Sequence, residues 1–255
     1  MGTMITIRLV LGYIMGTESL FLAMTVTFTA SCLQGIAGFG AGLISMGALA
    51  SIWSVPFATA VMLPLGVILN LSLMIQRHQT VELTSLRWVF IGLPVGVILG
   101  LFLLESVSES FLKQLLGLAL GISAVNTMMP NHLQRKYGRF PALITGTCAG
   151  ISGTTLSASG PPILIYANLL GWNRDLYRAQ LSVLFLTCSS LALIALSVRG
   201  QVNLTTLSLS LSLTPTVLIG SIVGATLGSW LPQRVFRLFV QCLLILLSAR
   251  FILRS

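Results

Sequence analysis

Apolar residues follow one another along this chain in long runs that charged residues interrupt only briefly. No Asp, Glu, Lys or Arg occurs in the ranges 19–76, 88–104, 114–134, 140–173, 179–198 and 200–233. A helix needs about 20 apolar residues to cross the hydrocarbon core of a bilayer, so the first of these runs must contain more than one crossing. The pattern predicts an all-α fold, a polytopic bundle of transmembrane helices.

Polar positions, glycine and proline divide the apolar runs into five segments in each half of the chain. The segments of the first half are expected at 9–34, 41–53, 56–75, 88–104 and 112–129. Those of the second half are expected at 140–150, 161–171, 176–198, 205–230 and 235–253.

The whole chain, residues 1–255, is expected to form a single transmembrane domain. We expect it to consist of a first repeat at 9–129, a linker at 130–139 and a second repeat at 140–253. The linker is the densest positive loop of the chain, and such loops stay on the cytoplasmic side of a membrane.

A glycine-rich break interrupts each half. The first reads Gln34-Gly35-Ile36-Ala37-Gly38-Phe39-Gly40-Ala41-Gly42, and the second reads Gly150-Ile151-Ser152-Gly153-Thr154-Thr155, then Ser157-Ala158-Ser159-Gly160-Pro161-Pro162. Interrupted helices in both halves of a duplicated membrane domain are typical of secondary transporters. Irregular backbone at membrane depth needs cover from protein or from a water-filled cavity. We therefore expect the two breaks to face each other across a central cavity.

Glycines also recur at four-residue spacing in both halves, at Gly92, Gly96 and Gly100 and at Gly220, Gly224 and Gly228. Residues with this spacing share one face of a helix, and without a side chain they let a neighbouring helix approach closely. We interpret these glycines as packing residues.

The short segments 140–150 and 161–171 leave two topologies open, because neither is long enough to cross a membrane alone. As a hairpin that enters and returns, they give three crossings per half and inverted repeats. As one broken crossing, they give four crossings per half and parallel repeats. Both arrangements leave equal numbers of basic residues inside, so we favour inverted repeats only because many secondary transporters build a central site that way.

The breaks predict an anion site. Helix N-termini carry partial positive charge and unpaired amides, which bind anions without a buried cation. The acidic residues all lie outside the middle of the apolar runs, at Glu18, Glu82, Glu105, Glu109 and Asp175. A cation carrier usually keeps a carboxylate inside the membrane, so this distribution disfavours cation transport.

The candidate substrate-binding residues come from the two breaks and the helix after the second one. They are Gln34, Gly35, Gly38, Gly40, Gly42, Gly150, Ser152, Gly153, Thr154, Thr155, Ser157, Ser159, Gly160, Pro161, Arg178 and Gln180. Arg178, at a helix start, has two interpretations: its side chain extends to the membrane interface, or it captures anions at the mouth of the cavity. Asn70 and Asn168 are further polar residues inside apolar runs.

The four cysteines form no Cys-x-x-Cys or Cys/His pattern, and we expect no metal and no cofactor. Cys32 and Cys148 each lie close to a break. Two interpretations stay open for them: they are small buried thiols, or they contact a sulfur-containing substrate.

The net charge of +9 comes from basic residues that are scattered over short loops. This distribution is typical of a positive-inside membrane protein and does not indicate nucleic-acid binding. The expected partners are the lipid bilayer of the cell (inner or plasma) membrane and a small anionic substrate. A coupling ion (proton or sodium) and a homodimer are left open.

Over nearly its whole length, the chain resembles the TauE/SafE family of sulfite exporters and 4-toluene sulfonate uptake permeases. The motifs that carry the resemblance are Gly35 to Gly42, Gly150-Ile151-Ser152-Gly153, Val55-Pro56-Phe57 and Arg174-Asp175-Leu176-Tyr177-Arg178. The second break departs from the commoner Gly-Gly-Gly form, since it reads Ser159-Gly160-Pro161-Pro162. The resemblance implies anion transport, often of sulfur compounds, and does not single out one substrate.

These observations predict a secondary transporter of a small oxyanion or organic anion, foremost sulfite, a sulfonate or a related sulfur compound, that works by alternating access. A passive anion channel is the second hypothesis. An intramembrane hydrolase is the third, because the motif around Ser152 reads Gly-x-Ser-Gly. A nucleophilic serine needs a base within hydrogen-bond reach, and both histidines lie in predicted loops, so we expect no enzymatic activity.

Overall fold

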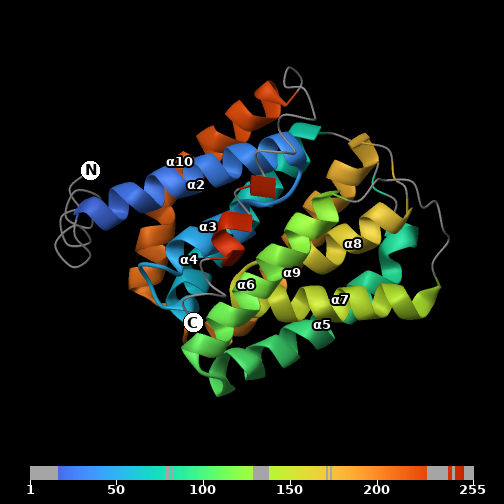
Figure 1. Ribbon diagram of the computed structural model, residues 1–255, viewed down its shortest axis with the longest axis horizontal. Coiled ribbons are helices and arrows are strands. Elements are labelled where there is room, and N and C mark those ends of the chain that lie inside the picture. The colour runs from blue at the N-terminus through green and yellow to red at the C-terminus, as the bar shows by residue number, and fades with distance from the viewer. Residues whose placement is uncertain are drawn as a thin grey trace.

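The computed structural model describes residues 17–77, 81, 83–128, 138–170, 172, 174–228, 241–242 and 245–249. Throughout these residues the regular elements are helices, which confirms the predicted all-α fold. In chain order they are α2 (Thr17–Ala37), α3 (Ala41–Leu49), α4 (Val55–Arg77), α5 (Leu83–Ser106), α6 (Glu109–Met128), α7 (Arg139–Leu156), α8 (Gly160–Leu170), α9 (Arg174–Val198) and α10 (Leu204–Leu227) (Figure 1). Residues 241–242 and 245–249 are helical as well.

Five of the described helices are long and apolar enough to cross a membrane. The candidate spans are Glu18–Ala37, Val55–Gln76, Leu86–Ser106, Leu176–Val198 and Leu204–Leu227, with mean hydropathy from 1.6 to 2.3. Large apolar side chains such as Ile98, Leu211 and Ile222 are more than half exposed on their outer surfaces. Such a surface is suited to contact with lipid, and the chain is a multi-pass membrane protein.

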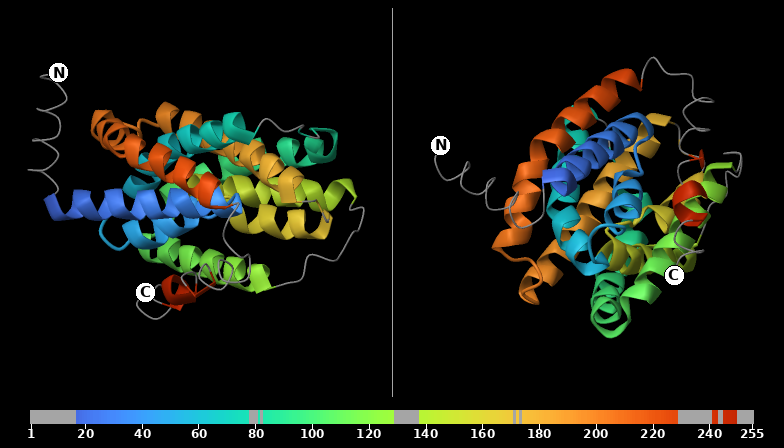
Figure 2. Two further views of the ribbon diagram at one scale, coloured as in Figure 1. Left: turned by 90° about the horizontal axis from the view of Figure 1, so that it is seen from above. Right: turned by 60° about the vertical axis from the view of Figure 1, so that its left-hand side comes forward.

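The same order of elements occurs twice: a long helix, a three-residue break and a short helix. The first break is 38–40, between α2 and α3, and the second is 157–159, between α7 and α8. Figure 2 shows α2 and α7 running from opposite ends of the molecule toward its middle, where each break turns the chain back into its short helix. The two breaks are therefore the tips of two helical hairpins.

Both breaks are shorter than the sequence predicts. Gly35 belongs to α2, Gly42 belongs to α3, and the segment expected to end at Gly150 continues as α7 to Leu156. The cause is close packing. A Cβ atom on Gly35 would lie 2.7 Å from the backbone of α10, and one on Gly150 would lie 2.5 Å from the carbonyl oxygen of Leu93 in α5. These glycines remain helical and accommodate a neighbouring backbone.

The repeated glycines pack two pairs of parallel helices, as predicted. A Cβ atom on Gly96 of α5 would lie 2.0 Å from the carbonyl oxygen of Thr147 in α7, and one on Gly224 of α10 would lie 2.0 Å from that of Cys32 in α2. Along α5 and α7 the contacts are Gly92–Leu143, Gly96–Thr147 and Gly100–Ile151, and along α10 and α2 they are Gly220–Phe28, Gly224–Cys32 and Gly228–Ile36. Residue numbers rise together in both pairs, so the two helices of each pair run parallel. The first helix of each half thus packs against the other half.

The packing of the first helix of each half against a helix of the other half agrees with the expected duplication. The internal repeat and its inverted orientation stay predictions. Most of the linker 130–139 lies outside the described residues, as do residues 9–16 and most of 235–253. The cytoplasmic location of the linker therefore also stays a prediction.

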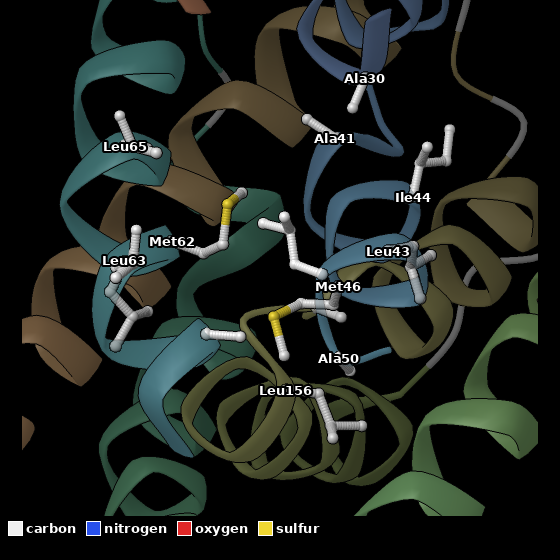
Figure 3. Close-up of a cluster of buried hydrophobic side chains, with 14 of the residues drawn as sticks. Ala30, Ala41, Leu43, Ile44, Met46, Ala50, Met62, Leu63, Leu65 and Leu156 are labelled. Atoms are coloured by element: carbon white, nitrogen blue, oxygen red, sulfur yellow. The ribbon is translucent and has the colours of Figure 1, made fainter. Parts of the chain in front are cut away.

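Helix α3 is buried on almost all sides, as expected for a helix that is apolar around its whole circumference. Figure 3 shows its side chains, including Met46, in one apolar cluster with Met62 of α4 and Leu156 of α7. This cluster fixes α3 between α4 and the end of α7. The N-terminus of α3 is thereby held at the centre of the protein.

Candidate functional site

The first turn of α3, directly after the first break, contacts the second break, so the two glycine-rich segments meet as the sequence predicts. A Cβ atom on Gly42, in the first turn of α3, would lie 2.1 Å from the carbonyl oxygen of Ser157 in the second break. Gly38 and Gly40 have φ angles of 90° and 110°, a region that glycine enters at little cost. Ser157 is also left-handed, with φ 48°.

A cavity lies between the breaks. The space open to the centre of a water-sized sphere is about 40 Å³, enough for roughly three water molecules. Its walls are Thr27, Ser31, Gln34, Gly40, Ala41, Gly42, Leu43, Ser45, Met62, Leu65, Gly66, Leu69, Asn70, Ser157, Ala158, Ser159, Gly160, Phe185, Ser189 and Val217. None of these described wall residues is charged, and many carry hydroxyl or amide groups.

Hydrogen bonds between amide groups hold the start of α3 against this cavity. The backbone N–H of Ala41 donates to Gln34 Oε1 at 3.0 Å, and Gln34 Nε2 donates to Asn70 Oδ1 at 2.8 Å. Asn70 Nδ2 in turn donates to the carbonyl of Gly66 at 2.8 Å. Both side chains are at most 4% exposed. Gln34 therefore acts as a cap for α3, although it lies in the preceding helix.

Several hydrogen-bond donors at the start of α3 have no acceptor among the described residues. The N–H groups of Gly42 and Leu43 make no such bond, as is normal for the second and third residues of a helix. The hydroxyl of Ser45, one turn further on, is 1% exposed and also unpartnered. These three groups belong to residues of the cavity wall.

The start of α8 faces the same cavity but supplies fewer donors. Its first residue, Gly160, lines the cavity, and Pro161 and Pro162 follow it without backbone N–H groups. The preceding turn closes with the N–H of Ala158 donating to the Ser152 carbonyl at 3.3 Å. Both short helices thus direct the positive ends of their dipoles at one uncharged cavity, but mainly α3 adds free amides.

Only some of the predicted site residues line this cavity. Those that do are Gln34, Gly40, Gly42, Ser157, Ser159 and Gly160. Those that do not are Gly35, Gly38, Gly150, Ser152, Gly153, Thr154, Thr155, Pro161, Arg178 and Gln180. Most of the second group belong to the last turns of α2 and α7, whose glycines pack against other helices.

The thiols and several polar groups differ from the sequence-based expectation. Cys32 is half-buried and Cys148 is exposed, and neither lines the cavity. Neighbouring helix segments contribute polar wall residues that were not predicted for the site, namely Thr27, Ser31, Ser45, Asn70 and Ser189. Asn70 was visible as a polar residue inside an apolar run, which is the one signal that could have found it.

Arg178 of α9 binds the end of α2 and does not line the cavity. Its guanidinium donates to the carbonyl of Ile36, the residue before the last in α2. Thr59 of α4 makes the corresponding contact in the other half, since its hydroxyl donates at 3.0 Å to Thr155, the residue before the last in α7. A positive charge at a helix C-terminus is stabilising. These contacts favour a positioning role for Arg178.

Arg178→Gln is accordingly expected to lower the maximal transport rate by about tenfold, because a hydrogen bond from a charged group contributes about 1.5–3 kcal/mol. The apparent KM should change little, and the effect should persist at high salt. Arg199→Gln, which removes an exposed arginine 3.7 Å from Glu105, is the control and should behave like the wild type. A raised KM that recovers at high salt would instead support anion capture by Arg178.

The chain is similar to known membrane transporters. The model of the family described as "Sulfite exporter TauE/SafE" matches residues 23–251. The chain is 25% identical over 199 residues to the "Probable sulfite/organosulfonate exporter TauE" of Cupriavidus necator, covering 75% of this chain and 77% of that protein. It is 27% identical over 244 residues to a "Probable membrane transporter protein" of Haemophilus influenzae, covering 91% and 92%. No solved structure matches significantly.

Proposed function

The chain belongs to the sulfite exporter TauE/SafE family of membrane transporters, and on this premise we propose that it is a secondary transporter of a small sulfur oxyanion. It would carry the anion across the cell membrane by alternating access. The observation that carries the proposal is the central cavity, where the two hairpin tips meet, no described wall residue is charged, and hydrogen-bond donors have no acceptor among the described residues. The name of the Cupriavidus necator relative supports sulfite as the first substrate to test.

The chemistry of the cavity is suited to transport. Helix dipoles and neutral donors attract an anion, while the absence of a charged residue among the described wall residues avoids an ion pair that would hold it. A site that moves its ligand must bind it well enough to admit it and weakly enough to release it. Dipoles and hydrogen bonds meet both requirements for an oxyanion.

The surroundings of the cavity favour a carrier over an open channel. Met46 of α3, Met62 of α4 and Leu156 of α7 belong to one apolar cluster, which follows the polar first turn of α3. An anion could pass this cluster only if α3 or the end of α7 moved. Gly38 and Gly40, whose φ angles are positive, give the backbone of the first hairpin tip the freedom to change conformation. Rearrangement of the hairpins would open the cavity to one side at a time.

The hydrolase alternative gains no support from Ser152. Its hydroxyl donates to the Cys148 carbonyl at 3.0 Å within α7. A serine nucleophile would instead need its hydroxyl hydrogen-bonded to a base.

Reconstitution in liposomes tests the proposal. Liposomes that contain the purified protein and a high concentration of unlabelled sulfite are diluted into a trace of ³⁵S-sulfite. A carrier exchanges the two, so labelled sulfite should accumulate transiently above its outside concentration. Accumulation equal to that of protein-free liposomes would contradict transport of sulfite. Rapid equilibration without transient accumulation would favour the channel.

A further inference from the structure

Ser45 is unusual among the buried hydroxyl groups of this protein. Many other serine and threonine side chains in the described helices donate to the carbonyl four residues earlier, as Ser31, Ser182 and Ser210 do at 2.6–2.9 Å. Ser45 is 1% exposed, and its hydroxyl makes no hydrogen bond to any described residue. An unpaired buried hydroxyl is destabilising, so its presence points to a group that pairs with it in another state of the protein.

The position of Ser45 indicates what that group is. Three buried serine or threonine hydroxyls of the described helices lack a partner, those of Ser45, Ser123 and Thr154, and only Ser45 lines the cavity. It lies one turn after the unpaired N–H groups of Gly42 and Leu43 on the same short helix. All of these groups can donate hydrogen bonds, so the ligand they suit presents several acceptor oxygens.

The opposite wall is poorer in donors and the cavity is small. Pro161 and Pro162 at the start of α8 offer no N–H, and Ala158, Phe185 and Val217 add apolar surface. The space open to the centres of water-sized spheres, about 40 Å³, matches a few water molecules. A space of this size suits an ion of four or five non-hydrogen atoms and is small for an aromatic ring.

We propose that the oxygens of the anion bind to the first turns of α3 and that Ser45 is a specificity-determining residue of this site. The substrate class is then small inorganic oxyanions with one central atom, and aromatic sulfonates are not substrates. The inference rests on the proposed function, because it identifies the ligand of the same cavity. The donors are the N–H groups of Gly42 and Leu43 and the hydroxyl of Ser45. The amides of Gln34 and Asn70 position this turn.

Ser45→Ala separates a ligand-binding role from a structural one. The variant removes an unsatisfied donor from the empty cavity, so the melting temperature without ligand should stay equal or rise. Its affinity for sulfite should fall about tenfold or more, because one hydrogen bond to a charged ligand is lost. Ser123→Ala is the matched control, since Ser123 is equally buried and unpartnered but lies on α6, outside the cavity wall.

The experiment measures thermal melting of the purified full-length proteins against sulfite and benzenesulfonate, together with sulfite exchange in liposomes. Sulfite should raise the melting temperature of the wild type and Ser123→Ala at the same concentrations, and of Ser45→Ala only at concentrations about tenfold higher. Benzenesulfonate should neither stabilise the protein nor inhibit exchange. These results together would support the inference.

Failure has two distinguishable forms. If the wild type exchanges sulfite but Ser45→Ala binds it equally tightly, or if benzenesulfonate competes as well as sulfite, the inference is overturned and the proposed function stands. If the wild type neither binds nor exchanges sulfite, both are overturned. A loss of stability in Ser45→Ala without ligand would also overturn the inference, because it would mean that the hydroxyl has a structural partner.

Discussion

Gly42→Ala is expected to reduce anion transport at least about 100-fold while leaving a folded protein in the membrane. The added Cβ atom would lie 2.1 Å from the carbonyl oxygen of Ser157 and 3.3 Å from its carbonyl carbon. Both are backbone atoms, so relief requires the two breaks to separate by about 1 Å or more. Displacements of this size at a reacting or binding centre cost about 100-fold in rate. The initial rate of ³⁵S-sulfite exchange measures the effect.

Two other glycines, one in the cavity wall and one at the opposite end of α7, provide the controls. A Cβ on Gly160, across the same cavity, would meet Leu43 Cδ1 at an ordinary 3.4 Å, and one on Gly138 would meet nothing within 4 Å. Gly160→Ala should therefore retain most of the transport activity, and Gly138→Ala should retain all of it. Wild-type transport by Gly42→Ala would show that close contact between the breaks is not required.

Gly96→Ala is expected to cause one of the two largest losses of stability that a single added methyl group produces at the packing glycines. Its Cβ would lie 2.0 Å from the Thr147 carbonyl oxygen and 2.9 Å from the Gly150 Cα, so α5 and α7 must move apart along their shared face. Overpacking of this kind costs about 3 kcal/mol, which corresponds to a fall in melting temperature of about 6–12 °C. Gly224→Ala, 2.0 Å from the Cys32 carbonyl oxygen, should show a loss of similar size.

The matched control is Gly121→Ala in α6. The nearest atom to its Cβ is Ser248 Oγ, a side-chain atom at 3.0 Å, and the next is 4.0 Å away, so no backbone has to move. Thermal melting of the purified variants should therefore give nearly the wild-type value for Gly121→Ala. If Gly96→Ala melts at the same temperature as Gly121→Ala, the four-residue glycine pattern does not hold the helices together.

The helical fold could be predicted because the bilayer requires it. Long uncharged runs have few stable alternatives to helices in hydrocarbon, so composition and run length were sufficient. The breaks were harder to delimit, because glycine serves two purposes here. Gly38 and Gly40 accept positive φ angles, whereas Gly35 and Gly150 accommodate a neighbouring backbone inside regular helices. Both roles require a missing side chain, and the sequence does not distinguish them.

The cavity could be predicted only in part, because its walls depend on how each helix is rotated about its own axis. Gln34 was found because it adjoins a break in the sequence. Ser45 and Asn70 line the cavity from within α3 and α4, and no local signal gives their direction. Cys32 is close to a break along the chain, yet its backbone packs against Gly224. Proximity in sequence to an irregular segment therefore identified the region of the site but not its individual residues.

Anomalous diffraction from crystals soaked in selenite tests most directly the claim that an oxyanion binds between the two breaks. Selenite is an oxyanion with the pyramidal shape of sulfite, and selenium is located by its own anomalous scattering. The account predicts a selenium peak in the central cavity, with selenite oxygens about 2.7–3.2 Å from the nitrogens of Gly42 and Leu43 and from Ser45 Oγ. Selenium peaks confined to exposed arginines, with the cavity occupied by water alone, would contradict it.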